Sequence, residues 1–437
     1  MSKNFYISTP IYYPSAKPHM GHAYSSIIAD FFARFKRIDG YDVFFLTGTD
    51  EHGLKIQRAA ENKGVDPQTF CNEISQTFRN LSQILNLSNT DFIRTTEDRH
   101  KKTVQSLWSK LEKNGDIYLS KYSGWYSVSD EAFYNIDEID DRDGNKIAIS
   151  SGSTVEWIEE ESYFFRLSKW QDKLLNYYEK NEDFILPKSR KNEVNNFVKN
   201  GLKDLSISRK AFSWGIKVPN SSDHVIYVWL DALTNYISAL NYLDNDSKLY
   251  KKFWPASLHL IGKDILRFHA VYWPAFLMAA NIPLPLKIYG HGWILSGEEK
   301  MSKSKGNILD PLEIIETYGL DPLRYYLIKE VSFGNDGNIS QERLEDCINS
   351  DLANNFGNLC QRVTSFAERN CSSQIPNIKK FDKADLKILN KFTKNLDNIR
   401  NEIDKQNINF YTDFIVSALF EANKYFNDQE PWKKKDD

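Results

Sequence analysis

The N-terminal segment constrains the fold most strongly, because it reads as a strand, a helix and a second strand in close succession. Residues 5–9 form a short apolar run typical of a buried strand, and a helical pattern begins near Gly21 and stops at Gly40. A second apolar run over residues 42–46 leads into the polar residues 47–53. This order predicts a parallel α/β sheet, in which ligands bind at the carboxyl ends of the strands.

A change of pattern near residue 116 indicates that this sheet is interrupted. Short aromatic and β-rich pieces with acidic turns follow, and apolar strand patterns return at residues 225–229, 258–261 and 287–289. From residue 351 onward the periodicity is helical with few glycines. The sequence therefore predicts an α/β fold with a Rossmann-like parallel sheet split by a mixed α/β insertion, followed by an all-α helix bundle.

The expected boundaries divide the chain into five parts. They are 1–115 for the first half of the Rossmann domain, 116–222 for the insertion, 223–292 for the second half, 293–349 for a connecting region and 350–437 for the bundle.

Composition excludes several classes of protein. The 437 residues carry a formal net charge of −3, so the overall charge gives no indication of nucleic-acid binding. Any contact with RNA would depend on local clusters of Lys and Arg. The 4 cysteines show no CxxC pair, which argues against a disulfide framework or a structural zinc site. No secretory signal and no apolar run near the roughly 20 residues of a membrane span are visible. We expect a soluble protein of the cytoplasm.

His19-Met20-Gly21-His22 stands where the first strand gives way to a helix. The N-terminus of a helix offers N–H groups and a partial positive charge to phosphate, Gly21 lets a purine approach the backbone, and both imidazoles can donate to phosphate oxygens. The alternative is a pair of ordinary histidines flanking a turn. The four-residue pattern alone does not decide between the two.

The second motif, Lys-Met-Ser-Lys-Ser at residues 300–304, lies between Gly297 and Gly306. A run of charges is usually a solvated face. The occurrence of both motifs in one chain, separated by half a sheet, favours the two halves of one ATP site, with the late loop folding over the triphosphate.

Two aromatic faces follow at helical spacing. Residues i, i+3, i+4 and i+7 of the first face are Trp229, Ala232, Leu233 and Tyr236. The second face carries Ile265, Phe268, His269 and Trp273. Spacing alone favours two core-facing helices over a ligand pocket.

Taken together, the chain resembles the class I aminoacyl-tRNA synthetases, and more closely the methionyl-tRNA synthetases, over essentially its whole length. The resemblance rests on an ordered set of motifs. These are residues 10–13 (PIYY), HMGH at 19–22, TGTDEHG at 47–53, DLSISR at 204–209, VWLDA at 228–232, GKDI at 262–265, HGW at 291–293 and KMSKS at 300–304.

The resemblance implies that both aromatic faces bind methionine rather than fill a core. With Ile11 and Tyr13 they would wrap the side chain, because an unbranched, polarizable thioether is well held by aromatic edges. Either Tyr236 or His269 would supply a polar contact near the sulfur. Asp50, at a strand end, is the natural carboxylate for the ammonium group of the substrate.

On the nucleotide side, the resemblance implies roles for residues of both motifs and of two strand ends. His19, Gly21 and His22 would bind ATP, Asp264 would bind the ribose, and the backbone near Ile294 would bind the adenosine. Arg209 would reach toward the reacting phosphate. Lys303, supported by Lys300, would neutralise pyrophosphate, and Mg²⁺ would accompany ATP.

The implied activity is the ATP-dependent activation of L-methionine to methionyl-adenylate, followed by transfer to the 3′ end of tRNA(Met). In such enzymes the insertion is a connective peptide, residues 293–349 hold the KMSKS loop and a stem-contact region, and the helix bundle binds the anticodon. Asn358, Arg362 and Trp432 match the anticodon-reading positions. From the residues alone, a position in the core of the bundle is the preferred interpretation of Trp432.

Two departures from the family pattern are visible. Many relatives hold zinc through CxxC pairs in the insertion, where this chain has Ser127 and Asp130; oxygen groups at that spacing hold zinc poorly, so we expect no structural metal. The chain also ends shortly after Trp432, which favours a monomer or a shortened chain.

Three other functions remain to be weighed. A synthetase for leucine, isoleucine, valine or cysteine fits badly, since it would need a longer insertion or zinc thiolates. A catalytically silent paralogue that binds tRNA has no use for both motifs, and a small-substrate nucleotidyltransferase has no use for the C-terminal helices.

Overall fold

The computed structural model describes residues 3–14, 17–130, 132–142, 144–296, 299–300, 310–374 and 380–434. The chain forms two compact units. The α/β unit consists of Met1–Pro18 and Ile28–His291, and the helical unit consists of His19–Ile27 and Gly292–Asp437. Helix α1 (Met20–Ile38) contributes residues to both.

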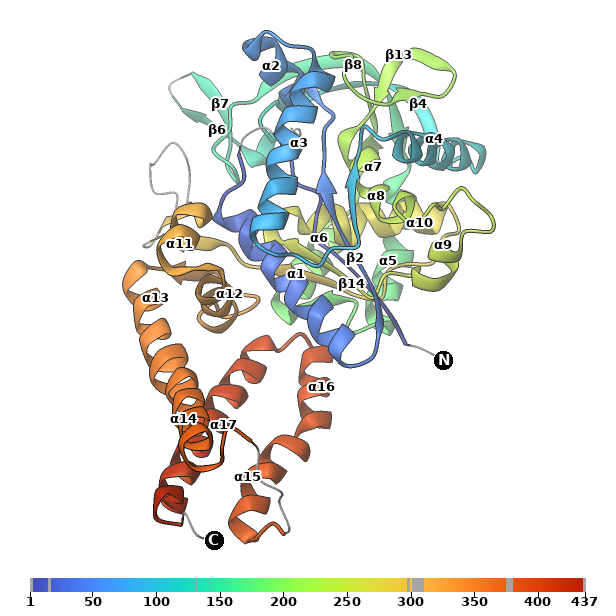
Figure 1. The fold of residues 1–437 in the computed structure, drawn as a ribbon. Coiled ribbons are helices and arrows are strands. Elements are labelled where there is room, and N and C mark those ends of the chain that lie inside the picture. Colours follow the sequence, from blue (N-terminus) through green and yellow to red (C-terminus); the bar gives the residue numbers. More distant parts are fainter. Residues whose placement is uncertain are drawn as a thin grey trace. The chain divides into compact units, whose positions relative to one another are not determined.

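A six-stranded parallel sheet forms the centre of the α/β unit (Figure 1), with strand order β3-β2-β1-β14-β15-β9. Its strands are β1 (Asn4–Ser8), β2 (Asp42–Thr49), β3 (Asp91–Arg94), β9 (Ile185–Leu186), β14 (Leu258–Gly262) and β15 (Ile288–His291). From β1 the chain proceeds outward to β2 and β3, whereas β14 lies on the other side of β1. The boundary between β1 and β14 is therefore the topological switch point, where open α/β sheets bind ligands.

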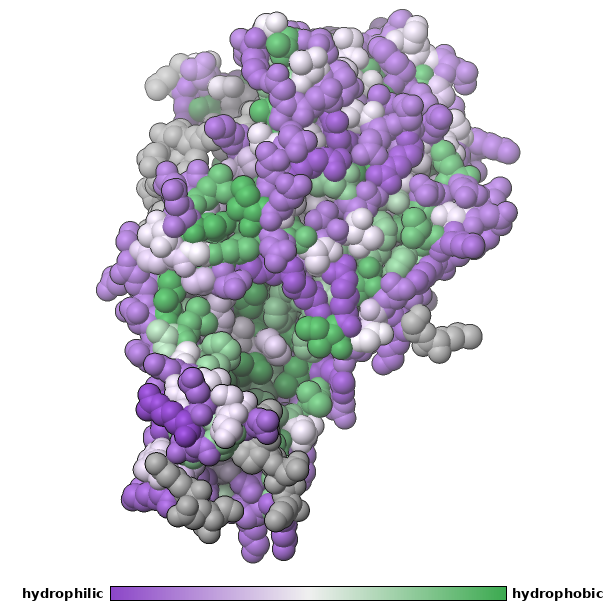
Figure 2. All heavy atoms as spheres, in the orientation of Figure 1, coloured by the Kyte–Doolittle hydropathy of each residue, from purple (hydrophilic) through white to green (hydrophobic). Residues whose placement is uncertain are grey.

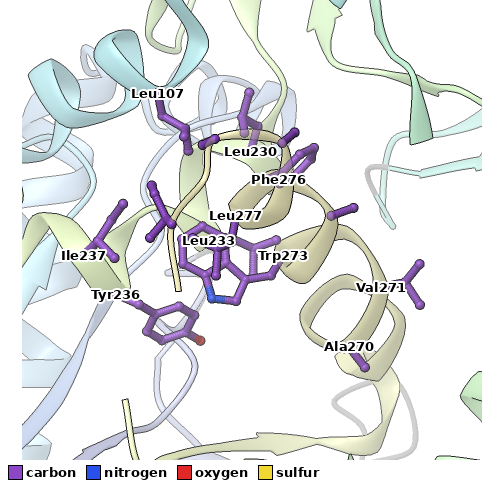
Figure 3. Packing of buried hydrophobic residues seen from close by; sticks show 14 of the residues in the cluster. Leu107, Leu230, Leu233, Tyr236, Ile237, Ala270, Val271, Trp273, Phe276 and Leu277 are labelled. Carbon is purple, nitrogen blue, oxygen red and sulfur yellow. The ribbon is translucent and has the colours of Figure 1, made fainter. Parts of the chain in front are cut away.

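The helices of this unit bury apolar side chains, the first two after α1 in small clusters and the others in one large hydrophobic core. Their bounds are α2 (Leu54–Lys63), α3 (Pro67–Ile84), α4 (Asp98–Lys113), α5 (Gln171–Lys180), α6 (Lys188–Lys199), α7 (Val228–Leu233), α8 (Asn235–Ser238), α9 (Lys248–Phe253) and α10 (Trp273–Ala279). Figure 3 shows Trp273 of α10 with Leu233 and Tyr236 in this core. Burying such side chains contributes about 1.5–3 kcal/mol each, so the core fixes α7, α8 and α10 next to the sheet.

The predicted insertion is built from antiparallel strands. One sheet has the order β10-β8-β4-β5, a second has β11-β13-β12, and β6 pairs with β7. The strands are β4 (Ile117–Ser127), β5 (Ala132–Tyr134), β6 (Ile139–Arg142), β7 (Asn145–Ala148), β8 (Glu156–Phe165), β10 (Leu205–Ser206), β11 (Ser208–Arg209), β12 (Lys217–Val218) and β13 (Ser221–Ile226). Although β9 falls within residues 116–222, it pairs with β15 and so returns the chain to the parallel sheet.

The strand predicted at residues 225–229 is wrong in kind and extent. Strand β13 ends at Ile226 and pairs antiparallel with β11 and β12, and α7 starts at Val228. The prediction was wrong because a short apolar run does not distinguish a parallel strand from an antiparallel strand or from a buried helix. The strands predicted near residues 5, 42, 258 and 287 are confirmed as β1, β2, β14 and β15.

The helical unit contains a three-stranded sheet and a series of helices. The strands are β16 (Ile294–Ser296), β17 (Glu299–Lys300) and β18 (Gly337–Ile339). The α-helices are α11 (Pro311–Tyr318), α12 (Leu320–Lys329), α13 (Gln341–Cys347), α14 (Asn358–Asn370), α15 (Lys383–Thr393), α16 (Leu396–Asp404) and α17 (Ile408–Gln429). In Figure 1, α13 continues into α14 through a π-helical segment, Ile348–Gly357, and α17 lies beside this segment.

The predicted fold class is confirmed: a Rossmann-like parallel sheet, a mixed insertion and C-terminal helices. The helices of the helical unit leave several large apolar side chains exposed, and Figure 2 shows hydrophobic patches among the polar surface there. They include Phe356, Val363, Leu386, Leu389, Leu396 and Phe420.

Candidate active site

Three strand ends meet at the switch point and carry several of the candidate residues of the α/β unit. Strand β1 runs into the segment with Ile11 and Tyr13, β2 ends just before Asp50, and β14 runs into Asp264. Hydrogen bonds hold the first two together, since the N–H of Tyr12 donates to the Gly48 carbonyl (2.8 Å) and the N–H of Asp50 donates to the Tyr12 carbonyl (2.9 Å).

The two aromatic faces predicted from spacing come together in the α/β unit. The rings of Trp229 and Phe268 stack with centroids 3.5 Å apart and planes 5° from parallel. Trp229, Phe268 and Ile265 are partly exposed, as are Ile11 and Tyr13, so these side chains are the accessible part of the set. Five members lie deeper and are buried: Ala232, Leu233, Tyr236, His269 and Trp273.

A hydrogen bond joins the two faces and fixes the protonation of His269. The Tyr236 hydroxyl lies 2.7 Å from Nε2 of His269, and Nδ1 of His269 lies 2.9 Å from the Ile265 carbonyl. A carbonyl only accepts, so Nδ1 carries the proton of the neutral ring and Nε2 accepts from Tyr236. Burial lowers the pKa of His269 to about 4 and keeps the ring neutral at pH 7. Tyr236 and His269 were both predicted as the polar contact near the sulfur. Of the two, Tyr236 is therefore the residue whose hydroxyl hydrogen a ligand could accept.

The stretch after β2 is anchored to β3 through Glu51. Asp50 is buried, and the next residue, Glu51, is 0% exposed. Glu51 forms a two-point ion pair with Arg94 of β3 at 2.7 and 2.9 Å and accepts from Thr49 and Thr96. Bidentate pairs of this kind are among the stronger polar contacts, so the backbone at Asp50 is held from β3.

Asp264 stands in a 3₁₀ turn, Lys263–Ile265, directly after β14, and its side chain is exposed. A Cβ atom on Gly262 would lie 2.6 Å from Oδ1 of Asp264. Only glycine therefore allows this carboxylate its position at the strand end. An exposed carboxylate there suits hydrogen bonding to a ribose hydroxyl, the role expected from the sequence.

The HMGH motif brings its two imidazoles into contact at the start of α1, with the ring planes tilted by 33°. The ring centroids of His19 and His22 are 3.8 Å apart. The N–H of Gly21 donates to Nδ1 of His19 and the N–H of His19 donates to Nδ1 of His22, each at 3.1 Å. Because each Nδ1 accepts a backbone hydrogen bond, the proton of each neutral ring is on Nε2. Burial and the neighbouring His19 lower the pKa of His22, so His22 is a neutral Nε2–H donor.

Gly21 leaves room for the His19 ring. A Cβ atom there would lie 3.0 Å from Cε1 and 3.2 Å from Nδ1 of His19, tighter than most Cβ contacts. With a larger residue at this position, the His19 ring would have to shift by a few tenths of an ångström.

Arg209 is buried in the α/β unit, with 2% of its surface exposed. Its Nη1 donates to the Ser206 hydroxyl (2.8 Å) and to the Ser208 carbonyl (2.6 Å), and its guanidinium lies 4.3 Å from the ring centroid of Tyr227. A stacked guanidinium of this kind is held in place with its charge intact. Its predicted reach toward a phosphate stays a prediction.

The KMSKS loop lies almost entirely outside the described residues. Lys300 is described through its backbone in β17, which pairs with Leu295 of β16, and Lys303 lies outside the described part of the chain. Ile294 is buried in β16, whose other neighbour is β18.

Two of the three predicted anticodon residues, Arg362 and Trp432, lie close to one ring of α17. The Arg362 guanidinium lies 4.9 Å from the Phe426 ring centroid and donates to Asn427, and the Trp432 ring lies 6.1 Å from Phe426. Asn358 is exposed at the start of α14, four residues before Arg362. Phe426 therefore supports both the cation and the indole, and Trp432 is 42% exposed rather than in a core.

Hydroxyl groups surround Asp130, at the position expected to lack zinc. Its carboxylate accepts from Ser151 (2.5 Å), Ser153 (2.9 Å) and Tyr134 (2.8 Å). Burial raises the pKa of Asp130, and these hydroxyl donors lower it by more, so the net pKa is below the ordinary value. Among the residues that the structure describes, no group of three or more His, Cys, Asp or Glu side chains is arranged to hold a metal ion.

Sequence reasoning missed Asp231 and His100. Asp231 is 0% exposed on α7 and bonds to both His52 and His100. A signal was present, because Asp231 is the one charged residue in the apolar segment 225–233, and buried carboxylates in such segments are paired.

In the described part of the chain, none of the helices has the length and apolar character needed to cross a membrane.

Comparisons with known proteins found both similar sequences and similar structures. A family model described as tRNA synthetases class I (M) matches residues 5–142 and 140–364. The chain is 54% identical over 438 residues to the methionine–tRNA ligase of Rickettsia conorii, covering 100% of this chain and 85% of that protein. It is 51% identical over 431 residues to the Brucella suis enzyme, covering 98% and 83%.

Two solved structures of Mycobacterium tuberculosis methionyl-tRNA synthetase are similar over the whole chain. The complex with methionyl-adenylate matches with a TM-score of 0.97 and 49% identity, covering 100% of this chain and 86% of that one. The apo form matches with a TM-score of 0.89 and 45% identity, covering 100% and 84%.

Proposed function

Because the chain belongs to the class I tRNA synthetases of the methionyl type, we propose that it is a methionine–tRNA ligase. It activates L-methionine with ATP to form methionyl-adenylate and transfers the methionine to the 3′ end of tRNA(Met). The observation that carries this proposal is the pair of aromatic faces at the switch point, joined by the Tyr236–His269 hydrogen bond. A neutral, aromatic site with one hydroxyl suits an unbranched thioether.

The amino-acid side of the reaction is served by the α/β unit. The ammonium group of methionine pairs with Asp50, whose backbone is tied to Tyr12 and whose neighbour Glu51 is tied to Arg94. The side chain contacts Ile11, Tyr13, Trp229 and the second aromatic face. These contacts orient the substrate carboxylate for attack, and such positioning is a large share of the catalysis of phosphoryl and adenylyl transfer.

The nucleotide side needs donors where negative charge develops. In the first step a carboxylate oxygen of methionine bonds to the α-phosphorus of ATP, and the bond from that phosphorus to the bridging oxygen breaks to release pyrophosphate. His19 and His22 offer Nε2–H groups to phosphate oxygens, since each Nδ1 accepts from the backbone. Lys303, with Lys300, and Arg209 neutralise the departing charge, and Mg²⁺ enters with ATP as part of the substrate.

In the second step a hydroxyl of the terminal ribose of tRNA attacks the carbonyl carbon of the adenylate, and AMP leaves with the bonding electrons. The RNA partner is selected in the helical unit. We assign anticodon contact to Asn358, Arg362 and Trp432, because an exposed indole and a guanidinium supported by Phe426 suit stacking on unpaired bases. Protein synthesis places this activity in the cytoplasm, and we propose that the enzyme acts as a monomer.

The test is ATP–pyrophosphate exchange with each of the twenty amino acids, followed by charging of unfractionated tRNA. We expect exchange with methionine above every other amino acid, and charging of tRNA by methionine alone. Strong exchange with leucine, isoleucine, valine or cysteine would identify a different synthetase. Exchange without charging would leave a small-substrate adenylyltransferase, and tRNA binding without exchange would leave a silent paralogue.

A further inference from the structure

A carboxylate without solvent contact, Asp231, lies between two imidazoles of the α/β unit. Its Oδ2 is 2.7 Å from Nδ1 of His52, and its Oδ1 is 2.8 Å from Nε2 of His100. Asp231 and His100 are 0% exposed and His52 is 3% exposed. A buried charge is costly unless it is paired and hydrogen-bonded, so the two histidines account for the tolerance of a carboxylate here.

The chain of contacts continues beyond His100. Its Nδ1 lies 2.9 Å from the hydroxyl of Ser238. Burial raises the pKa of Asp231, and the contacts with His52 and His100 lower it by more, so the carboxylate stays ionised. The network thus links the stretch after β2 to α4, α7 and α8 through four side chains.

His52 connects this network to Asp50. The two residues belong to one short stretch, and the His52 carbonyl accepts a hydrogen bond from the Tyr13 hydroxyl (3.0 Å). The His52 ring also contacts the edge of Trp214, with centroids 5.5 Å apart. With His52 held by α7 and Glu51 held by β3, the backbone that carries Asp50 has little freedom to shift.

Helix α7 connects the same network to the side-chain pocket. It carries Trp229 and Ala232 on either side of Asp231. We infer that Asp231 is a positioning residue that sets the Asp50 carboxylate relative to the aromatic faces, so that an ammonium group and a side chain are recognised at a fixed separation. This inference rests on the proposed function, because it assigns Asp50 to the ammonium group.

Loss of Asp231 should affect the contact with the ammonium group more than the contacts with the rest of the ligand, whereas a general loss of structure would weaken both. If Asp231 acts through Asp50, its removal weakens the recognition of the ammonium group. If it only supports the fold, its removal weakens every ligand of the pocket equally. Two competitive inhibitors of the exchange reaction distinguish these cases: methioninol, which keeps the ammonium group, and 4-(methylsulfanyl)butan-1-ol, which lacks it.

The test compares Asp231→Asn with the unmodified enzyme. Asparagine keeps the shape of the Asp231 side chain and removes the negative charge that pairs with His52. We expect the inhibition constant of methioninol to rise about tenfold, as for loss of a hydrogen-bonded charge contact, while that of the amine-free alcohol stays within about twofold. KM for methionine should rise in parallel with the inhibition constant of methioninol, and KM for ATP should not change.

Asp30→Asn is the matched control. Asp30 is also a carboxylate with 0% exposure, and it accepts from Arg34 (2.6 Å) and from the N–H of Ser88 (2.7 Å) in the same unit. We expect this variant to lose stability while keeping the ratio of the two inhibition constants. If Asp231→Asn does not fold, Ser238→Ala is the second variant, because it removes the far end of the network. We then expect the inhibition constant of methioninol, relative to that of the amine-free alcohol, to rise about twofold.

Equal weakening of both inhibitors, or an unchanged ratio in the folded variant, overturns the inference. The unmodified enzyme tests the premise separately. If it supports no methionine-dependent exchange, the proposed function fails. If it does support exchange but binds the amine-free alcohol as tightly as methioninol, the assignment of Asp50, and the inference with it, fails.

Discussion

At the scale of single residues, Tyr236 governs what the methionine site that we propose can offer to a thioether. Its hydroxyl hydrogen is directed at Nε2 of His269, because Nδ1 of that ring is committed to the Ile265 carbonyl. Sulfur is a weak hydrogen-bond acceptor, so a bound methionine competes modestly for this hydrogen, whereas a methylene group does not compete at all.

Replacing Tyr236 by Phe should therefore reduce the preference for methionine over norleucine. We expect the ratio of kcat/KM values in ATP–pyrophosphate exchange to fall about fivefold, the size of one neutral hydrogen bond, and the melting temperature to fall because His269 loses its donor. Tyr272→Phe is the control, since Tyr272 is a partly buried tyrosine of the helical segment that carries His269. An unchanged preference in Tyr236→Phe would assign the sulfur contact elsewhere.

Spacing was enough to predict the two aromatic faces, but not the proton on His269. The face positions follow from helical periodicity, which the sequence displays directly. The tautomer depends on the Ile265 carbonyl, which is left available to a side chain where a π turn, Phe268–Tyr272, interrupts the regular helix. The contact between Asp231 and His100 was not predicted for a similar reason, because 131 residues separate them and only the fold brings them together.

At the scale of elements, the hydroxyl cage of Asp130 ties two turns of the insertion. The turn after β4 supplies Asp130, and the segment after β7 supplies Ser151 and Ser153. The sequence predicted oxygen groups in place of cysteines here, but not that hydroxyl groups from a distant turn would converge on one carboxylate.

Asp130→Ala should loosen this connection. Charge-assisted hydrogen bonds contribute about 1.5–3 kcal/mol each, and the three lost donors remain near solvent, so we expect a local loss of roughly 1–3 kcal/mol. Hydrogen exchange followed by mass spectrometry should show faster exchange in residues 144–155, with ATP–pyrophosphate exchange retained. Asp140→Ala removes an exposed acid bonded to Arg142 and serves as the control. Equal protection in the two variants would contradict the role of the cage.

Elements were predicted well where their pattern was unambiguous and poorly where a run was short. Helix α1 and strands β1, β2, β14 and β15 follow from long periodicity or from flanking glycines and polar ends. The run at residues 225–229 is split between β13 and α7, and the two residues of β9 carry no signal of their own. Their pairing is decided by the strands around them.

At the scale of the whole molecule, the methionine binding and the anticodon recognition that we propose draw on different parts of the chain. The methionine-side residues belong to the α/β unit, and the predicted anticodon residues belong to the helical unit. The order of motifs was sufficient to predict both functions, because each motif occupies its own segment. A change in the anticodon residues should thus affect charging without affecting adenylate formation.

Trp432→Ala tests that separation. Base stacking on an aromatic ring contributes about 1–3 kcal/mol, so kcat/KM for tRNA in charging should fall about tenfold, while kcat/KM for methionine in ATP–pyrophosphate exchange stays unchanged. Phe420→Ala is the matched control, because Phe420 is an exposed aromatic residue of α17, 54% exposed against 42% for Trp432. A parallel loss of exchange, or a similar loss of charging in Phe420→Ala, would mean that Trp432 supports the helices rather than reads the RNA.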